Sequence, residues 1–201
     1  MRDIKEMTSQ PQLNKEKFFR KFPIIRFGDF ILRELMLADN IRYYQLLSDP
    51  NVSQYLSDED IPRSPEAAIE EIKFWSSLFY MKHSIYWCIA EAKTNNLIGT
   101  IGFNSWSFYN NRAEISYELM SQYWRRGIMS ATMSQVLDFA FTNMQIHRME
   151  AKTMTHNIAS QKFLEKHGFT REALMKAYRK VRGEFVDIET YVLFKNDWLR
   201  Q

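Results

Sequence analysis

The feature that most constrains the fold of this chain is an abrupt change in hydrophobic period near residue 122. Residues 112–120, RAEISYELM, alternate in the way that is typical of a half-buried strand. From residue 128 to about Asn143, apolar side chains recur at helical spacing instead. Between the two segments lies QYWRRG, residues 122–127. The sequence therefore predicts a strand that turns through two arginines and one glycine directly into a helix.

The remaining segments follow the same two periods. Helical spacing and capping residues predict further helices at 39–48, 64–81 and 157–167. Alternating or short apolar runs predict strands at 29–35, 84–92, 97–106, 147–154, 169–181 and 184–194. Two leading helices followed by interleaved strands and helices indicate an α/β protein, with a mixed sheet flanked by helices. Residues 1–27 are expected to form an N-terminal arm that packs its phenylalanines on a single domain, residues 28–201.

Composition excludes several classes of function. No segment approaches the roughly 18 apolar residues that span a bilayer, and the first thirty residues lack a signal-peptide block. The single cysteine, Cys88, excludes an internal disulfide and is expected to be a buried structural residue. The net charge of +3 is too small to indicate nucleic acid, and the four histidines lack metal-ligand spacing. We therefore expect a cytoplasmic protein without a membrane, nucleic-acid or metal partner.

The turn between strand and helix suits an anionic ligand. A helix N-terminus exposes unpaired N–H groups, and a preceding glycine allows a ligand to approach the backbone closely. Arg125 and Arg126 add bidentate donors, which suits a diphosphate. The turn lacks the lysine and hydroxyl of a P-loop and the further glycines of a dinucleotide fingerprint. On this pattern alone, two merely solvated arginines remain the alternative.

Four segments, taken together and in this order, resemble the GNAT N-acetyltransferase superfamily. They are AEISYEL (113–119), YWRRGIM (123–129), HRMEA (147–151) and NIASQKFLEKHGF (157–169). The resemblance covers about residues 28–196 and is greatest to the branch that contains ribosomal-protein N-terminal alanine acetyltransferases. It departs at Ser116, where glycine is usual, and at Met129, where a smaller residue is usual. It implies the GNAT acyl-CoA N-acyltransferase fold.

The resemblance implies acetyl-CoA as the donor and no metal. The turn would cradle the coenzyme A diphosphate, the free strand edge would pair with the pantetheine arm, and Asn157 would contact that arm or a bound water. A main-chain N–H near Leu119 or Met120 would stabilise the oxyanion. Asn157 as a simple helix cap is the alternative. The implied coenzyme-binding residues are Leu119, Met120, Ser121, Arg125, Arg126, Gly127, Ile128, Met129, Ser130, Asn157 and Ser160.

Candidate catalytic residues follow from the strand and from the later helix. Alternation places Glu114, Ser116 and Glu118 on one face of the strand and Tyr117 on the other. Carboxylates on this strand resemble the general bases of the family, and we expect Glu114 first and Glu118 second, with exposed or salt-bridged roles as the alternative. Ser160, one helical turn from Asn157, is the expected proton donor to the leaving thiolate. Leu164 occupies the position at which many relatives carry a tyrosine, so bulk water is the other candidate acid.

Direct attack of a primary amine on acetyl-CoA in a ternary complex is the leading hypothesis. The acceptor is the N-terminal amine of a (ribosomal) protein or a small amine such as an antibiotic or a polyamine. A strongly cationic acceptor would need an acidic cleft, which the segment SDEDIP, residues 57–62, could line; a solvated loop is the alternative. A non-catalytic coenzyme A-binding module is a further possibility. The sequence leaves monomer and homodimer open.

Overall fold

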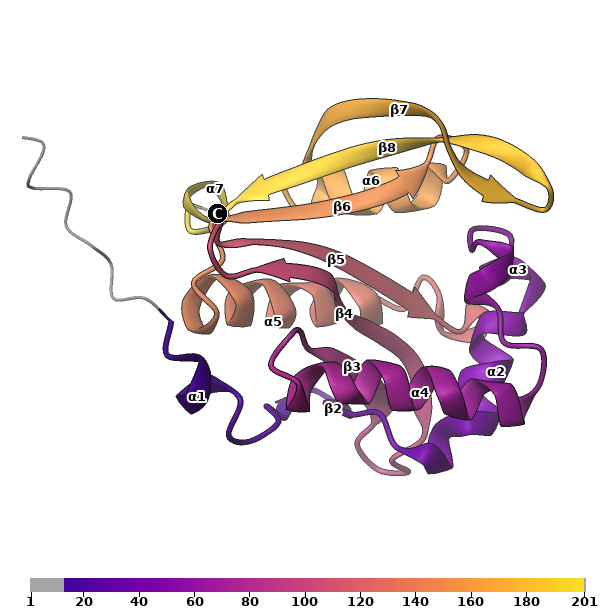
Figure 1. Cartoon of the computed structure of the whole chain (residues 1–201), viewed down its shortest axis with the longest axis horizontal. Coiled ribbons are helices and arrows are strands. Elements are labelled where there is room, and N and C mark those ends of the chain that lie inside the picture. Colours follow the sequence, from indigo (N-terminus) through magenta and orange to yellow (C-terminus); the bar gives the residue numbers. More distant parts are fainter. Residues whose placement is uncertain (1–12, 201) are drawn as a thin grey trace, which may run out of the picture.

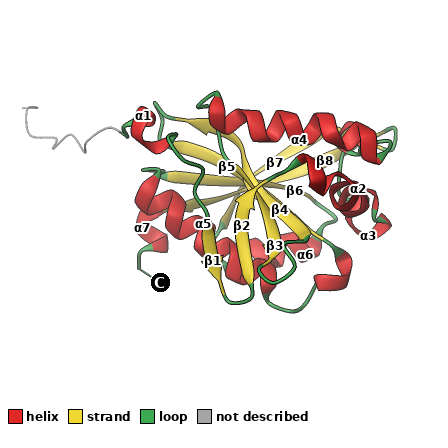
Figure 2. Ribbon diagram, turned by 90° about the horizontal axis from the view of Figure 1, so that it is seen from below, coloured by secondary structure: helices red, strands yellow, loops and turns green. Residues whose placement is uncertain are grey.

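The computed structural model describes residues 13–200, in which one open mixed sheet carries helices on both faces (Figures 1 and 2). The strand order is β1-β2-β3-β4-β5-β6-β8-β7. The strands are β1 (Ile25–Phe27), β2 (Phe30–Glu34), β3 (Tyr86–Glu91), β4 (Leu97–Ser107), β5 (Arg112–Leu119), β6 (Arg148–Met154), β7 (Thr170–Val181) and β8 (Glu184–Phe194). The predicted α/β architecture is confirmed.

The α-helices include all those predicted from hydrophobic spacing. They are α1 (Lys15–Phe18), α2 (Asn40–Ser48), α3 (Pro50–Ser53), α4 (Pro65–Tyr80), α5 (Ile128–Asn143), α6 (Ile158–Lys166) and α7 (Lys195–Trp198). Short 3₁₀ turns are η1 (Leu37–Asp39), η2 (Asp58–Asp60) and η3 (Ser121–Tyr123). The segment between residues 48 and 65, expected to be a loop, contains α3 and η2. These elements are too short to give a hydrophobic period.

Both faces of the sheet are buried along β3 and most of β4, and strand alternation divides the side chains between two cores. In β3, Trp87 and Ile89 face the core built on α5, whereas Tyr86 and Cys88 face the core built on α2 and α4. Figure 2 shows α4 on one side of the sheet and α5 with α6 on the other. The thiol of Cys88 is buried, as expected, and burial raises its pKa, which suits a structural rather than a reactive residue.

The described part of the N-terminal arm belongs to the first of these cores. The ring centroids of Phe18 and Trp106 lie 5.3 Å apart, and those of Phe19 and Phe79 lie 5.1 Å apart. The predicted packing of these phenylalanines on the body is therefore confirmed. Strand β1 pairs with β2 through a turn at Gly28, so the end of the arm and the domain share one sheet.

The centre of the sheet opens between its two parallel strands. β5 and β6 pair only from Arg112↔Arg148 to Ile115↔Ala151, although β5 continues to Leu119 and β6 to Met154. Figure 1 shows the two strands diverging beyond that point. Beyond Ile115, β5 therefore has a strand partner on one edge only, which is β4. This opening creates a large cavity.

Candidate active site

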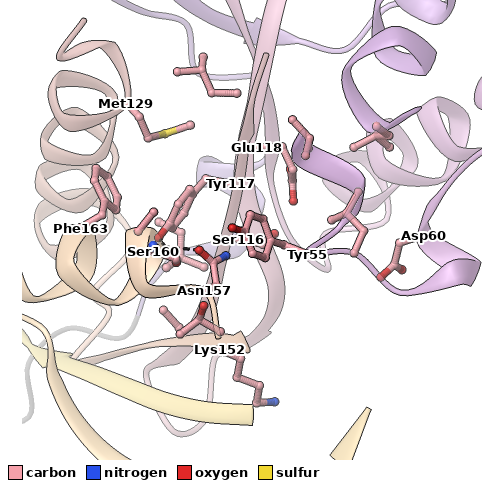
Figure 3. A pocket seen from close by; sticks show the side chains of 18 of the residues that line it. Tyr55, Asp60, Ser116, Tyr117, Glu118, Met129, Lys152, Asn157, Ser160 and Phe163 are labelled. Atoms are coloured by element: carbon pink, nitrogen blue, oxygen red, sulfur yellow. Dashed lines mark hydrogen bonds between the residues drawn. The ribbon is translucent and has the colours of Figure 1, made fainter. Parts of the chain in front are cut away.

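The divergence of β5 and β6 leaves a cavity of about 1110 Å³ that passes from one face of the sheet to the other. One wall comes from the beginning of α5, from α6 and from β6. The opposite wall comes from α2, α4 and the segment that contains α3 and η2. Figure 3 shows the end of β5 in the middle, with Tyr117 on one side and Glu118 on the other. Side chains from both faces of β5 therefore line the same cavity.

The charges around the cavity are divided between its walls. Arg125 and Lys166 line it on the side of α5 and α6. Glu59, Asp60 and Glu71 line it on the side of α2 and α4. Carboxylates of the predicted SDEDIP segment therefore do face the cavity. Lys152, paired with Glu114, and Arg179 line the cavity as well. The charges on the two helical walls suit an anionic ligand at one end and a cationic ligand at the other.

The beginning of α5 presents unpaired backbone donors to the cavity. Gly127 has φ +74° and Arg125 has φ +59°, so the chain makes a tight left-handed turn into the helix. The first intrahelical bond is donated by Ala131 N–H to the Gly127 carbonyl at 3.0 Å, which leaves the N–H groups of residues 128–130 without helical acceptors. A Cβ atom on Gly127 would meet no atom within 4 Å. The free donors and open space fit a diphosphate.

Five of the six residues predicted to form the diphosphate turn line this cavity. Arg126 does not, and its guanidinium lies 5.4 Å from the centroid of the Tyr123 ring. The hydroxyl of Ser130 lies 2.9 Å from Nε2 of His167, whose burial, followed by the charge of Lys166, lowers its pKa. The five lining residues are Arg125, Gly127, Ile128, Met129 and Ser130.

Several backbone groups of the residues predicted to pair with the pantetheine arm are already hydrogen-bonded within the protein. Met120 N–H donates to the Ile98 carbonyl at 2.9 Å, and the Met120 carbonyl accepts from Tyr123 N–H at 2.9 Å. The Leu119 carbonyl accepts from the indole N–H of Trp124 at 2.7 Å. Of the three residues predicted for this edge, only Leu119 lines the cavity, and Ser121 instead donates its hydroxyl to Asp49.

Glu118 is held in a polar network at the cavity wall. Its Oε2 accepts hydrogen bonds from Thr100 Oγ1 at 2.6 Å and from the Tyr86 hydroxyl at 3.0 Å. Oε1 takes no hydrogen bond from the residues that the structure describes. Burial raises the pKa of this carboxyl, although the two donated hydrogen bonds partly oppose the shift. Such a carboxylate has a greater tendency to accept a proton than an ordinary glutamate.

Glu114 lines the same cavity but has a cationic partner. Its Oε2 lies 2.7 Å from Nζ of Lys152 on β6, and both side chains are mostly buried. Glu114 also lies where β5 still pairs with β6, opposite Glu150. The two glutamates therefore share a face, as alternation predicts, but they differ in environment. Glu114 therefore has the salt-bridged role that was the alternative for a glutamate of this strand.

A tyrosine and a serine meet on the other side of β5. The hydroxyl groups of Tyr117 and Ser160 lie 2.8 Å apart, and burial raises the pKa of Tyr117. The Tyr117 ring also packs against Phe163, with 5.1 Å between ring centroids. Sequence analysis placed Tyr117 on this face but gave it no role, because its contact with α6 joins residues 43 positions apart. A tyrosine next to Ser160 thus comes from β5 and not from position 164.

Asn157 caps α6, as the simpler of its two interpretations holds. Its Oδ1 accepts from Ser160 N–H at 3.1 Å, and the residue also lines the cavity. The cap fixes the first turn of α6 and thereby the position of the Ser160 hydroxyl. The side-chain amide nitrogen of Asn157 can still donate a hydrogen bond to a ligand.

Sequence analysis missed the residues of α2, α4 and β3 that line the cavity. Tyr43 donates its hydroxyl to Glu71 Oε2 at 3.3 Å, and Trp75 stacks on Tyr86 with 4.4 Å between ring centroids. Burial raises the pKa of Glu71 to about 7, and the charge of Asp60 adds to the shift. The available signal was the position of Glu71 within the apolar stripe of the predicted helix, next to Ile72 and one turn before Trp75.

Comparisons with known proteins agree with this geometry. Residues 29–170 match the family model described as "Acetyltransferase (GNAT) domain". The chain is 33% identical over 174 residues to the uncharacterized N-acetyltransferase YoaA of Bacillus subtilis (strain 168), covering 87% of this chain and 98% of that protein.

Two solved structures share the fold. The first is the ribosomal-protein-S5-alanine acetyltransferase from Vibrio fischeri, with a TM-score of 0.76 at 21% identity, over 88% of this chain and 98% of that one. The second is RimL, a ribosomal L7/L12 alpha-N-protein acetyltransferase solved in complex with coenzyme A. Its TM-score is 0.78 at 22% identity, over 86% of this chain and 98% of that one.

Proposed function

Because the chain belongs to the GNAT acetyltransferase family and is an N-acetyltransferase, we propose that the cleft between β5 and β6 moves the acetyl group of acetyl-CoA to a primary amine. One observation carries this proposal. The end of β5 presents a carboxylate with a raised pKa on one side and a paired tyrosine and serine on the other, next to the unpaired donors of α5. A base, an acid and an anion site thus meet at one strand end.

Acetyl-CoA is the donor that GNAT enzymes use, and it supplies an activated acetyl thioester. We expect the N–H groups of residues 128–130, with Arg125, to hold its diphosphate. Since Met120 N–H is directed toward β4, alternation turns the backbone groups of Leu119 toward the opening between the strands. The Leu119 N–H is therefore the main-chain donor best placed for the thioester oxygen, and Met120 is not.

Glu118 is proposed as the general base, ahead of Glu114. The acceptor must lose its proton to become a nucleophile, and the raised pKa of Glu118 favours that transfer. Glu114 is neutralised by Lys152 and lies before the strands separate. Transfer then forms the bond between the amine nitrogen and the acetyl carbon and breaks the carbon–sulfur bond.

Tyr117 and Ser160 are proposed to return a proton to the departing sulfur. The raised pKa of Tyr117 keeps its hydroxyl protonated at neutral pH, so it can donate. A phenol is also a stronger acid than an aliphatic hydroxyl, so Tyr117 is the natural source of the proton that Ser160 passes on. The 2.8 Å separation of the two hydroxyls permits that relay.

Two acceptor classes have support. Similarity to ribosomal-protein acetyltransferases supports the N-terminal amine of a protein, and acceptors of that kind favour a cytoplasmic location. The carboxylates Glu59, Asp60 and Glu71 support a small cationic amine instead, since they line the cavity opposite the coenzyme end. No helix of residues 13–200 is long and apolar enough to cross a membrane.

Calorimetric titration with acetyl-CoA tests the donor site. We expect Gly127→Val to weaken binding at least about tenfold, since the added side chain fills the open space at the diphosphate position. The matched control is Gly28→Val, which also replaces a glycine at positive φ with no atom near the new Cβ but lies in the β1–β2 turn. Equal affinities of the two variants for acetyl-CoA would contradict this assignment.

A further inference from the structure

We propose that the acceptor is a small diamine, and that Glu71 binds its second ammonium group while the first one reacts beside Glu118. This inference rests on the proposed function, because it concerns the acceptor end of the same cleft. It assigns a specificity-determining role to a residue on α4 that the chemistry of acetyl transfer does not require.

Three carboxylates converge on this end of the cavity without a basic partner. Glu71, Asp60 and Glu118 all line it, and none of them forms an ion pair within the described residues 13–200. The charge of Asp60 contributes to the raised pKa of both glutamates. Close carboxylates repel one another, and a cation between them removes that repulsion. A neutral or singly charged acceptor would leave part of it in place.

Aromatic rings join the two glutamates. Trp75 lies one helical turn after Glu71 on α4 and stacks on Tyr86, with 4.4 Å between centroids and 23° between ring planes. The hydroxyl of Tyr86 in turn donates to Glu118. Ring faces attract ammonium groups, and a short methylene chain packs well on them. The site thus has a carboxylate at each end and an apolar surface between them, which matches a diamine.

Contacts across the cleft favour a small acceptor over a polypeptide. The tip of the β7–β8 hairpin meets η2, where Arg182 N–H donates to Asp58 Oδ1 at 3.0 Å. Figure 1 shows this hairpin end close to α3, on the side of the cleft that faces α2. Tyr55 and His156 also meet, with 5.9 Å between ring centroids. These contacts join the two walls beside Glu59 and Asp60, where a polypeptide therefore has less room than a small amine.

The test compares two acceptors that have the same four-carbon chain, 1,4-diaminobutane and n-butylamine, at saturating acetyl-CoA. We expect the wild-type kcat/KM to be at least about tenfold higher for the diamine, the scale of one hydrogen-bonded charge pair. Glu71→Gln should abolish this preference by raising KM for the diamine, without changing acetyl-CoA affinity. The matched control is Glu70→Gln, since Glu70 is exposed on the outer face of α4 and pairs with Lys73.

The outcomes separate this inference from the function on which it rests. Equal kcat/KM for the two amines, or a diamine preference that survives in Glu71→Gln, overturns the inference and leaves the acetyltransferase assignment intact. If a peptide N-terminus without a second positive charge is acetylated faster than the diamine, the inference is likewise overturned and the acetyltransferase assignment stands. Acetyl-CoA binding without transfer to any amine overturns the proposed function together with the inference. A diamine preference lost only in Glu71→Gln supports both.

Discussion

At the scale of single residues, the environment of a carboxylate decides its role more than its position on the strand. Glu114 and Glu118 lie on the same face of β5, four residues apart. Lys152 forms an ion pair with Glu114, whereas Glu118 is buried and accepts hydrogen bonds from two hydroxyl groups. Burial disfavours the charged form of Glu118 and raises its pKa, which makes this carboxylate a better proton acceptor.

Replacement of the two glutamates separates these roles. We expect Glu118→Gln to lower kcat about 100-fold or more, in the usual range for loss of a general base. Glu114→Gln should lower kcat less than about tenfold, through the unpaired Lys152 left behind. Steady-state rates of both variants with acetyl-CoA and one fixed amine measure this. The reverse order of effects would return the base assignment to Glu114.

The raised pKa of Glu71 predicts a pH dependence of stability in the free protein. Burial raises this pKa to about 7 in the folded state, above the value near 4.3 of an unfolded chain. The folded state then binds more protons between these values, so stability falls as pH rises through about 7. Because Glu71 is only half-buried, we expect a loss of roughly 1 kcal/mol after solvent screening.

Urea unfolding at pH 5 and pH 8 measures this loss. Glu71→Gln has no carboxyl to titrate, so its unfolding free energy should change less between the two pH values than that of the wild type. Glu70→Gln serves as the control, because Glu70 is solvent-exposed. An identical pH dependence in the wild type and Glu71→Gln would contradict the burial of this charge.

The pair Tyr117 and Ser160 predicts a graded loss of activity. Tyr117→Phe removes the proposed proton source and should lower kcat roughly 10–100-fold, with little change in acetyl-CoA affinity. Ser160→Ala should lower kcat by a smaller factor. A water molecule can replace the serine hydroxyl as a relay, but it cannot replace the phenol of Tyr117 as the proton source. The kcat of each variant is measured with two acetyl thioesters, one whose thiol is a good leaving group and one whose thiol is a poor leaving group. A Tyr117→Phe enzyme with wild-type kcat would remove the tyrosine from the mechanism.

At the scale of elements, the turn from β5 into α5 contains a contact that coenzyme binding must disturb. The Trp124 indole donates to the Leu119 carbonyl, on the edge where the family resemblance places the pantetheine arm. We expect acetyl-CoA to displace this indole, and so to change tryptophan fluorescence in the wild type. Trp124→Phe should lose that change while still binding acetyl-CoA. Identical fluorescence changes in both proteins would show that the indole stays in place.

Elements with a long hydrophobic period could be predicted from the sequence, and so could their faces. The alternation of β5 placed Glu118 and Tyr117 on opposite sides, and the Ser64–Pro65 pair placed the beginning of α4. The short helices α3 and η2 could not be predicted, since three or four residues show no period. Contacts such as Glu114 with Lys152 were also out of reach, because they join strands far apart in the sequence.

At the scale of the whole molecule, the site exists because one sheet is covered on both faces and split at its centre. The core built on α5 holds β5 and β6 in place on either side of the opening. α5 and α6 then supply one wall of the cleft, and α2 and α4 supply the other. The donor and the acceptor can therefore approach β5 from opposite faces and meet at its end. This arrangement favours direct transfer within a ternary complex.

The most direct test of this account is two-substrate kinetics of acetyl transfer, followed by thiol release and by the mass of the intact protein. We predict intersecting double-reciprocal lines, one thiol released per acetylated amine, and no acetyl group on the protein. The single cysteine, Cys88, is buried in β3 and cannot serve as a carrier. Parallel lines together with an acetylated protein would contradict direct transfer in the cleft between β5 and β6.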